Sequence, residues 1–150
     1  MIMMRKNGYE KENFMVIGID HGYGNIKTAN TCFRTGVTKY EKEPTFQNNL
    51  LVYEGMYYQI GEEHKEFLAE KMMDEDYYIL TLAAIARELH IAGIYRAKVH
   101  LAAGLPLTWV SEQKEAFREY LLQHKTADYT FRDKQFHVEF TGADIFPQGF

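Results

Sequence analysis

The chain has 150 residues, enough for one domain with a substantial hydrophobic core. Hydrophobic residues make up 46% of the sequence and charged residues 25%, which is typical of a folded globular protein and excludes a disordered chain. The formal net charge of −4 argues against a protein that binds nucleic acid or anionic membranes through overall positive charge.

The remaining bulk features point to a cytoplasmic protein. The single cysteine, Cys32, excludes an intrachain disulfide and fits a reducing compartment, where such a residue is usually buried. No apolar run is long enough to span a membrane, and the N-terminal segment lacks the features of a signal peptide. Residues 1–13 are mostly polar and are predicted to form a flexible leader.

The first half of the chain consists mainly of β-prone segments. An apolar run ends in the carboxylate of Asp20, two glycines then indicate a tight turn, and Glu54-Gly55 predicts the turn of a β-hairpin. The predicted strands span residues 14–20, 26–33, 36–40, 50–53 and 56–61. The charged residues between 62 and 76 predict a solvated connection.

The second half alternates between helical and β patterns. Apolar residues at helical spacing predict a helix over 76–92 that Gly93 ends, and Ser111 is the expected N-cap of a second helix. The predicted strands span residues 97–104, 127–132, 135–141 and 144–146. This order predicts an α/β domain over residues 14–150, with a mixed sheet flanked by helices and extra β-hairpins.

The segment Asp20-His21-Gly22-Tyr23-Gly24-Asn25-Ile26-Lys27 carries the most chemical information. A carboxylate at a strand end can hold magnesium directly or through its water shell. Two glycines let the backbone approach a ligand, successive amides can bind an anion, and a lysine on the returning strand can reach a phosphate. The alternative is a β-hairpin whose glycine turn is structural and whose lysine lies on the surface.

The histidines and the aromatic residues around Tyr57 are expected to have structural roles. The six histidines show no metal-binding spacing, and His21 is expected to be a solvent-exposed turn residue, with a contact to phosphate as the alternative. The aromatic residues around Tyr57 are expected to pack in the core, and a surface for self-association is the second option.

Residues 17–27 resemble the phosphate-1 motif of the actin, Hsp70 and sugar-kinase superfamily, and are most similar to bacterial actin-like proteins of the ParM/StbA plasmid-segregation type. Three further features occur in the family's order. They are a helix over 77–93 before a strand over 99–104, the segment Gly104-Leu105-Pro106-Leu107-Thr108, and the segment Ile145-Phe146-Pro147-Gln148-Gly149. The resemblance covers residues 14–150 and implies a ribonuclease-H-like fold.

The resemblance assigns roles to individual residues. Asp20 is expected to organise the waters of a magnesium ion, Lys27 to contact phosphate, and Gln148 to position the attacking water, so Asp20 and Gln148 are the catalytic candidates. The backbone amides of the turn are expected to bind β- and γ-phosphate oxygens; these residues are Gly22, Tyr23, Gly24 and Asn25. Tyr23 stands where many relatives carry Ser or Thr.

The implied function is that of the N-terminal domain of an actin-like ATPase that forms nucleotide-dependent filaments in plasmid or DNA segregation. The family's second domain is absent from this chain, so ATP or GTP with magnesium is expected to bind well only in a full-length two-domain protein. Expected partners are further copies of the protein and an adaptor bound to centromere-like DNA, with no direct contact to nucleic acid or membrane. The alternative is a non-catalytic binding or assembly module with the ribonuclease-H-like fold.

Overall fold

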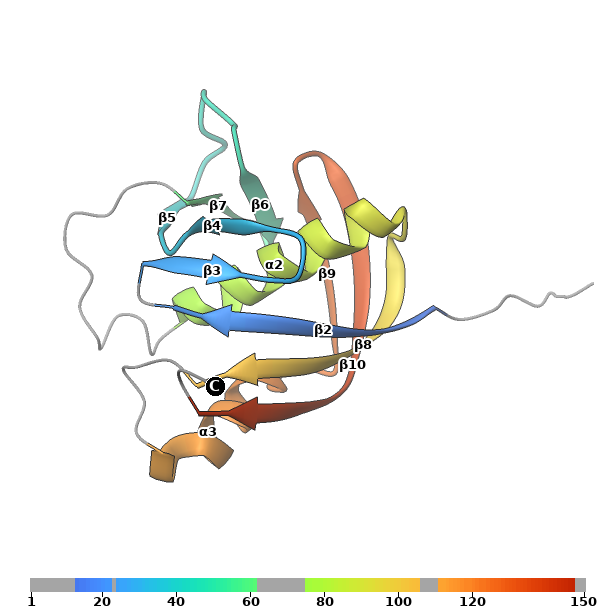
Figure 1. Cartoon of the computed structure of the whole chain (residues 1–150). Coiled ribbons are helices and arrows are strands. Elements are labelled where there is room, and N and C mark those ends of the chain that lie inside the picture. The colour runs from blue at the N-terminus through green and yellow to red at the C-terminus, as the bar shows by residue number, and fades with distance from the viewer. Residues whose placement is uncertain (1–12, 23, 62–74, 106–110, 148–150) are drawn as a thin grey trace, which may run out of the picture.

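The computed structural model describes residues 13–22, 24–61, 75–105 and 111–147. Its strands are β2 (Phe14–His21), β3 (Asn25–Lys27), β4 (Cys32–Arg34), β5 (Val37–Tyr40), β6 (Leu50–Tyr53), β7 (Met56–Ile60), β8 (Arg96–Gly104), β9 (Thr126–Phe131) and β10 (Lys134–Phe146). Its helical elements are α2 (Tyr77–Ala92), the 3₁₀ turn η2 (Ser111–Gln113) and α3 (Lys114–Leu121). The strands form one mixed sheet in the order β4-β3-β2-β8-β10-β9-β6-β7-β5 (Figure 1).

Three parallel strands form the centre of the sheet. β2 pairs with β8, and β8 pairs with β10, each in parallel register. Alternate side chains of β2 and β8 are buried, as expected for strands with one covered face. In Figure 1 the arrowheads of all three strands point to the same side of the molecule, so their carboxyl ends share one edge of the sheet.

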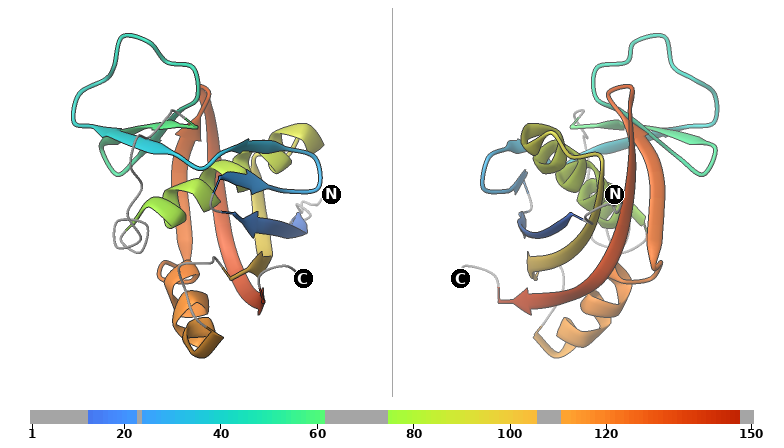
Figure 2. Two further views of the ribbon diagram at one scale, coloured as in Figure 1. Left: turned by 60° about the vertical axis from the view of Figure 1, so that its left-hand side comes forward. Right: turned by 90° about the vertical axis from the view of Figure 1, so that its right-hand side faces the viewer.

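Both described α-helices lie on the same face of the sheet. Nearly all of α2 is buried, and it ends at Gly93, which has a left-handed φ of 73°. Phe117 of α3 packs edge-to-face against His21, which shares the buried face of β2 with Ile17 and Ile19. The opposite face of β2 exposes Phe14 and Val16, which are 60% and 61% accessible. Figure 2 shows the strong curvature of the sheet around α2.

Most predicted elements are confirmed. The first strand, the hairpin formed by β6 and β7, α2 and β8 all lie within one or two residues of the expected bounds. Glu54 and Gly55 both have positive φ values, 51° and 79°, as a two-residue hairpin turn requires. Residues 1–12 of the predicted leader, residues 62–74 of the acidic run and Gln148 fall outside the described residues. No helix in the described part of the chain is long and apolar enough to cross a membrane.

Three predictions of local structure are wrong. The returning strand expected over 26–33 is two strands, β3 and β4, because residues 28–31, three of them polar, form a turn between them. The strands expected over 135–141 and 144–146 are one strand, β10, with an irregularity between Phe140 and Gly142. The second helix begins as the 3₁₀ turn η2 and becomes α-helical only at Lys114.

Two predictions of exposure are also wrong. Cys32, expected to be buried, is exposed on β4, which forms one edge of the sheet. His21, expected in a solvent-exposed turn, is the last residue of β2 and is fully buried. The aromatic residues around Tyr57 were expected to pack in the core, with a self-association surface as the second option. Tyr53 and Tyr58 are core residues, whereas Tyr57 is half-buried.

Candidate functional site

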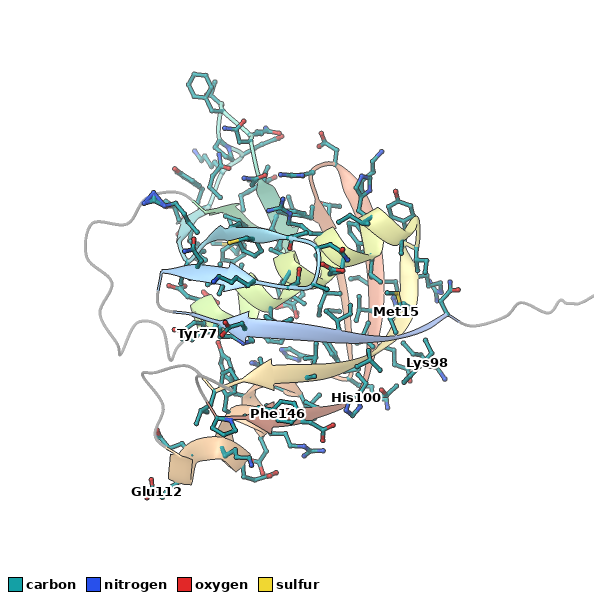
Figure 3. The ribbon with its side chains drawn as sticks, viewed as in Figure 1. Met15, Tyr77, Lys98, His100, Glu112 and Phe146 are labelled. Atoms are coloured by element: carbon teal, nitrogen blue, oxygen red, sulfur yellow. The ribbon has the colours of Figure 1, made fainter. Side chains whose placement is uncertain are left out.

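The candidate site begins where the three parallel strands end. Asp20 lies beside Gly104 in the β2–β8 register, and Gly104 lies beside Phe146 in the β8–β10 register. Because neighbouring strands are about 5 Å apart, the backbones of Asp20 and Phe146 are roughly 10 Å apart along this edge. In Figure 3, Tyr77 at the start of α2 lies near the end of β2, and Phe146 marks the end of β10. β10 therefore ends at the same edge of the sheet that carries Asp20.

The glycine turn after β2 is fixed by hydrogen bonds at both ends. The Gly22 N–H donates to the Asn25 carbonyl at 3.0 Å, which closes the hairpin between β2 and β3. Thr35 holds the outer side of the turn, since its hydroxyl donates to the Gly22 carbonyl at 2.9 Å and its N–H to the Gly24 carbonyl at 3.0 Å. Within the described part of the chain, the Gly24 N–H has no hydrogen-bond acceptor.

The two glycines of the turn serve different purposes. A Cβ on Gly22 would lie 2.5 Å from the Asn25 carbonyl oxygen, so the turn itself requires glycine at this position. A Cβ on Gly24 would meet no atom within 4 Å, and Gly24 has no positive φ. The fold therefore leaves open space beside the Gly24 backbone, where a ligand would meet the amide without an intervening side chain.

Asp20 and Lys27 face each other across the β2–β3 hairpin. They are direct partners in the antiparallel register, so their side chains lie on the same face of the sheet, and both residues are exposed. They form no ion pair with each other or with any other residue in the described ranges. A carboxylate and an ammonium group are therefore both available at the end of the hairpin, next to the glycine turn.

His21 lies behind this edge and is part of the packing between the sheet and α2. Its Nε2 is 2.8 Å from the Thr81 hydroxyl, and its ring packs edge-to-face against Tyr77 and Phe117. Burial lowers the pKa of His21 to about 4, and the nearby Gly104 backbone opposes this effect only weakly. The Gly104 contact falls short of a hydrogen bond, so Nδ1 has no partner among the described residues. His21 is therefore a neutral core residue at ordinary pH.

The structure thus brings Asp20, Gly22, Gly24, Asn25 and Lys27 together at one end of the sheet. Tyr23 and Gln148 lie outside the described residues. The described residues contain no group of three or more His, Cys, Asp or Glu side chains that could hold a metal ion. For Asp20, the resemblance implies contact with a magnesium ion through that ion's water shell.

Sequence reasoning missed Thr35 and Thr81. Thr35, which directly follows β4, donates a hydrogen bond to the Gly22 carbonyl in the glycine turn. Thr81 forms a hydrogen bond with the ring of His21. Both contacts join residues far apart in sequence, so no local motif indicates them. Thr35 is the more important of the two for the site, because it fixes the carbonyls on either side of residue 23.

Comparison with known proteins gives a consistent result. Residues 18–150 match the family model described as the N-terminal domain of actin-like proteins. The fold is similar to that of apo pSK41 ParM, with a TM-score of 0.67 and 13% identity over 91% of this chain and 50% of that one. It is also similar to the archaeal actin homologue Ta0583, with a TM-score of 0.66 and 20% identity over 89% of this chain and 46% of that one.

A third similar structure is that of the AlfA filament bound to AMPPNP, with a TM-score of 0.64 and 16% identity. The alignment covers 91% of this chain and 55% of AlfA. The chain therefore spans about half the length of the solved structures that it matches. No curated protein matches the chain in sequence.

Proposed function

Because the chain belongs to the family of actin-like protein N-terminal domains, we propose that it supplies one half of the nucleotide site of a filament-forming ATPase. The observation that carries this proposal is the common edge at which β2, β8 and β10 end, with the glycine turn beside it. In an α/β sheet, the carboxyl ends of parallel strands are the usual place for a ligand.

Each residue of the edge has a part in this proposal. Asp20 orients the waters around a magnesium ion, which would neutralise phosphate charge, and the open Gly24 amide donates to a phosphate oxygen. Lys27 supplies a positive charge on the neighbouring strand, and the amides of Tyr23 and Asn25 complete the turn. The Gly22 amide is already engaged with Asn25, so Gly22 shapes the turn and does not donate to the ligand. Gln148 orients the attacking water without removing its proton, since an amide is not a base.

The biological role proposed for the whole protein follows the family. Solved relatives include ParM bound to AMPPNP and a filament of AlfA bound to AMPPNP, which supports nucleotide binding and self-assembly. We place the protein in plasmid or DNA segregation, with an adaptor on centromere-like DNA as its partner. Because the chain spans about half the length of these relatives, we expect it to bind Mg-ATP only weakly by itself.

Backbone amide chemical shifts test the position of the site in the chain as it exists. Titration with millimolar Mg-ATP should shift amides of residues 20–27 and of the ends of β8 and β10, and the shifts should require magnesium. Asp20→Asn should abolish them. Asp144→Asn is the matched control, because Asp144 is also an exposed carboxylate on the central strands but pairs with His100 at 3.0 Å.

Two results would contradict the proposal. If saturating nucleotide leaves this edge unshifted while the chain remains folded, the glycine turn is structural and the non-catalytic assembly module becomes the better interpretation. If the isolated chain binds Mg-ATP with a low-micromolar Kd, the site is complete within one domain and the two-domain scheme is wrong.

A further inference from the structure

A second hollow lies at the opposite end of α2, away from the nucleotide edge. The C-terminal half of α2 forms one wall, the turn between β9 and β10 forms another, and the turn between β3 and β4 closes the side; Figure 1 shows these segments together. The cavity has a volume of about 180 Å³. That volume is close to the size of a cavity that accepts one aromatic ring.

The wall of this hollow combines an apolar floor with positive charge. Ala86, Phe131 and Phe136 form the apolar part. Arg87, Arg132 and Lys134 bring three cations from two different elements, and His90 lies on the same wall. No Asp or Glu belongs to the described lining, although the chain as a whole is acidic. The local charge is therefore opposite in sign to that of the protein.

Two of these cations contact neutral groups of the fold. Arg87 lies 5.3 Å from the centre of the Phe33 ring, and Arg132 donates to the Asn49 side chain at 2.8 Å. Among the described residues, none of the three cations pairs with a carboxylate. Burial and the neighbouring charge of Arg132 lower the pKa of Arg87, so an anion placed here would relieve an existing repulsion.

Glu88, next to Arg87 in sequence, attracts the Arg87 charge but forms no ion pair with it within the described residues. The Glu88 carboxylate accepts hydrogen bonds from the Thr28 hydroxyl and from the backbone and side chain of Asn30, all at 2.5–2.9 Å. Asp133 is exposed at the tip of the β9–β10 turn and forms no ion pair with a described residue. The hollow thus offers cationic donors over an apolar floor, with space for one side chain.

We propose that this hollow binds an acidic, aromatic segment of a partner protein, with one apolar side chain in the cavity and carboxylates on Arg87, Arg132 and Lys134. A protein segment fits better than a free small molecule, because the apolar lining of the cavity reaches the molecular surface at Ile91, which is 57% exposed. A polyanion such as nucleic acid fits poorly, because the rings of Phe131 and Phe136 are buried at 3% and 1% exposure and offer no stacking face.

Fluorescence anisotropy with a labelled peptide of alternating Glu and Phe tests the proposal on the complete 150-residue chain. The peptide should bind, and a peptide with Lys in place of Glu should not. Lys134→Glu and Arg87→Gln should each weaken binding about tenfold, the effect of losing one charge-assisted hydrogen bond. Lys114→Glu, an exposed lysine on α3, makes the same charge change as Lys134→Glu and should leave the affinity unchanged. Thermal melts establish whether each variant is folded. If Arg87→Gln does not fold, the affinity of Lys134→Glu alone tests the proposal.

Several outcomes would overturn the proposal. These are absence of binding, an equal loss in Lys114→Glu, and hydrogen-exchange protection that lies outside residues 86–91 and 131–136. Displacement of the peptide by free phenylacetate or inorganic phosphate at comparable affinity would identify a small-anion pocket instead. Sedimentation that shows a dimer lost in Lys134→Glu would identify a second copy of the chain as the occupant.

Discussion

The burial of His21 has a consequence for stability that depends on pH. Its pKa is lowered from 6.5 to about 4 in the folded chain, because desolvation disfavours the charged ring. Both states are neutral at this residue above pH 6.5, so its contribution is fully present there. As the pH falls from 6.5 towards 4, the unfolded state takes up the proton first, and up to about 3 kcal/mol of stability is lost.

We therefore expect His21→Gln to flatten the acid side of the stability profile. Between neutral pH and about pH 5, the unfolding free energy of the variant should fall about 2 kcal/mol less than that of the parent chain. Urea unfolding at the two pH values measures this difference. His124→Gln, an exposed histidine beyond α3, is the control and should keep the parent's slope. An unchanged slope in His21→Gln would mean that the ring is solvated.

The two glycines of the turn permit a matched pair of substitutions. Gly22→Ala should cost about 1–3 kcal/mol, because its methyl group would overlap the Asn25 carbonyl oxygen. Gly24→Ala should change stability by less than about 0.5 kcal/mol, since open space surrounds its position. Urea unfolding measures both, and equal effects would contradict the geometry of the turn. If the turn receives a phosphate, Gly24→Ala should also reduce the amide shifts caused by Mg-ATP.

The sequence predicts the site only in part. The order of Asp20, the glycines and Lys27 is local, so their common position follows from one strand, one turn and one returning strand. The anchoring of the turn by Thr35 and the burial of His21 depend on β4, α2 and α3, and no short motif encodes such contacts. His21 was misplaced because its neighbouring glycines suggest a solvated turn, whereas the alternation of β2 directs its side chain to the core.

At the scale of elements, Glu88 joins α2 to the turn between β3 and β4. The carboxylate binds Thr28 and Asn30, and burial alone would raise its pKa, but these hydrogen bonds and the charge of Arg87 outweigh burial and lower it. The stability that comes from this lowered pKa is therefore present above the unfolded value near 4.5 and is lost as the pH falls through the folded value.

Glu88→Ala should destabilise the chain by about 2 kcal/mol, because three hydrogen bonds to a carboxylate are lost together. Hydrogen exchange at the Asn30 amide should accelerate more than exchange in β8. The control is Glu115→Ala on α3, since that side chain is 69% exposed and makes a single 3.4 Å contact with Arg118. Equal effects of the two substitutions on unfolding would mean that Glu88 does not fasten the turn.

The elements that the sequence misjudged are those set by contacts between segments far apart in the chain. The turn over residues 28–31 is stabilised by Glu88 from another element, so propensity alone favoured an unbroken strand. Separate strands were expected over 135–141 and 144–146, but β10 stays continuous because β8 pairs with it on one side from Arg96 to Gly104. By contrast α2 was predicted well, because a long apolar period and a C-terminal glycine are local signals.

For the whole molecule, the order of elements predicted the fold class but not the order of strands. β9 lies between β10 and β6, and β5 follows β7 at the far edge, so chain order and sheet order differ. The described helices cover a single face, and the other face of β2 is open to solvent. Adjacent residues on β2 therefore have very different surroundings.

Val16 and Ile17 test this arrangement directly, because they are neighbours on β2 that point to opposite faces. Val16 is 61% exposed and Ile17 is 3% exposed. Ile17→Ala should cost about 2–5 kcal/mol, since it leaves a cavity beneath α2, whereas Val16→Ala should cost less than about 1 kcal/mol. Urea unfolding of both variants measures the contrast. A large loss of unfolding free energy in Val16→Ala would show that the open face is covered in solution. A small loss in Ile17→Ala would contradict the burial of Ile17 in the core.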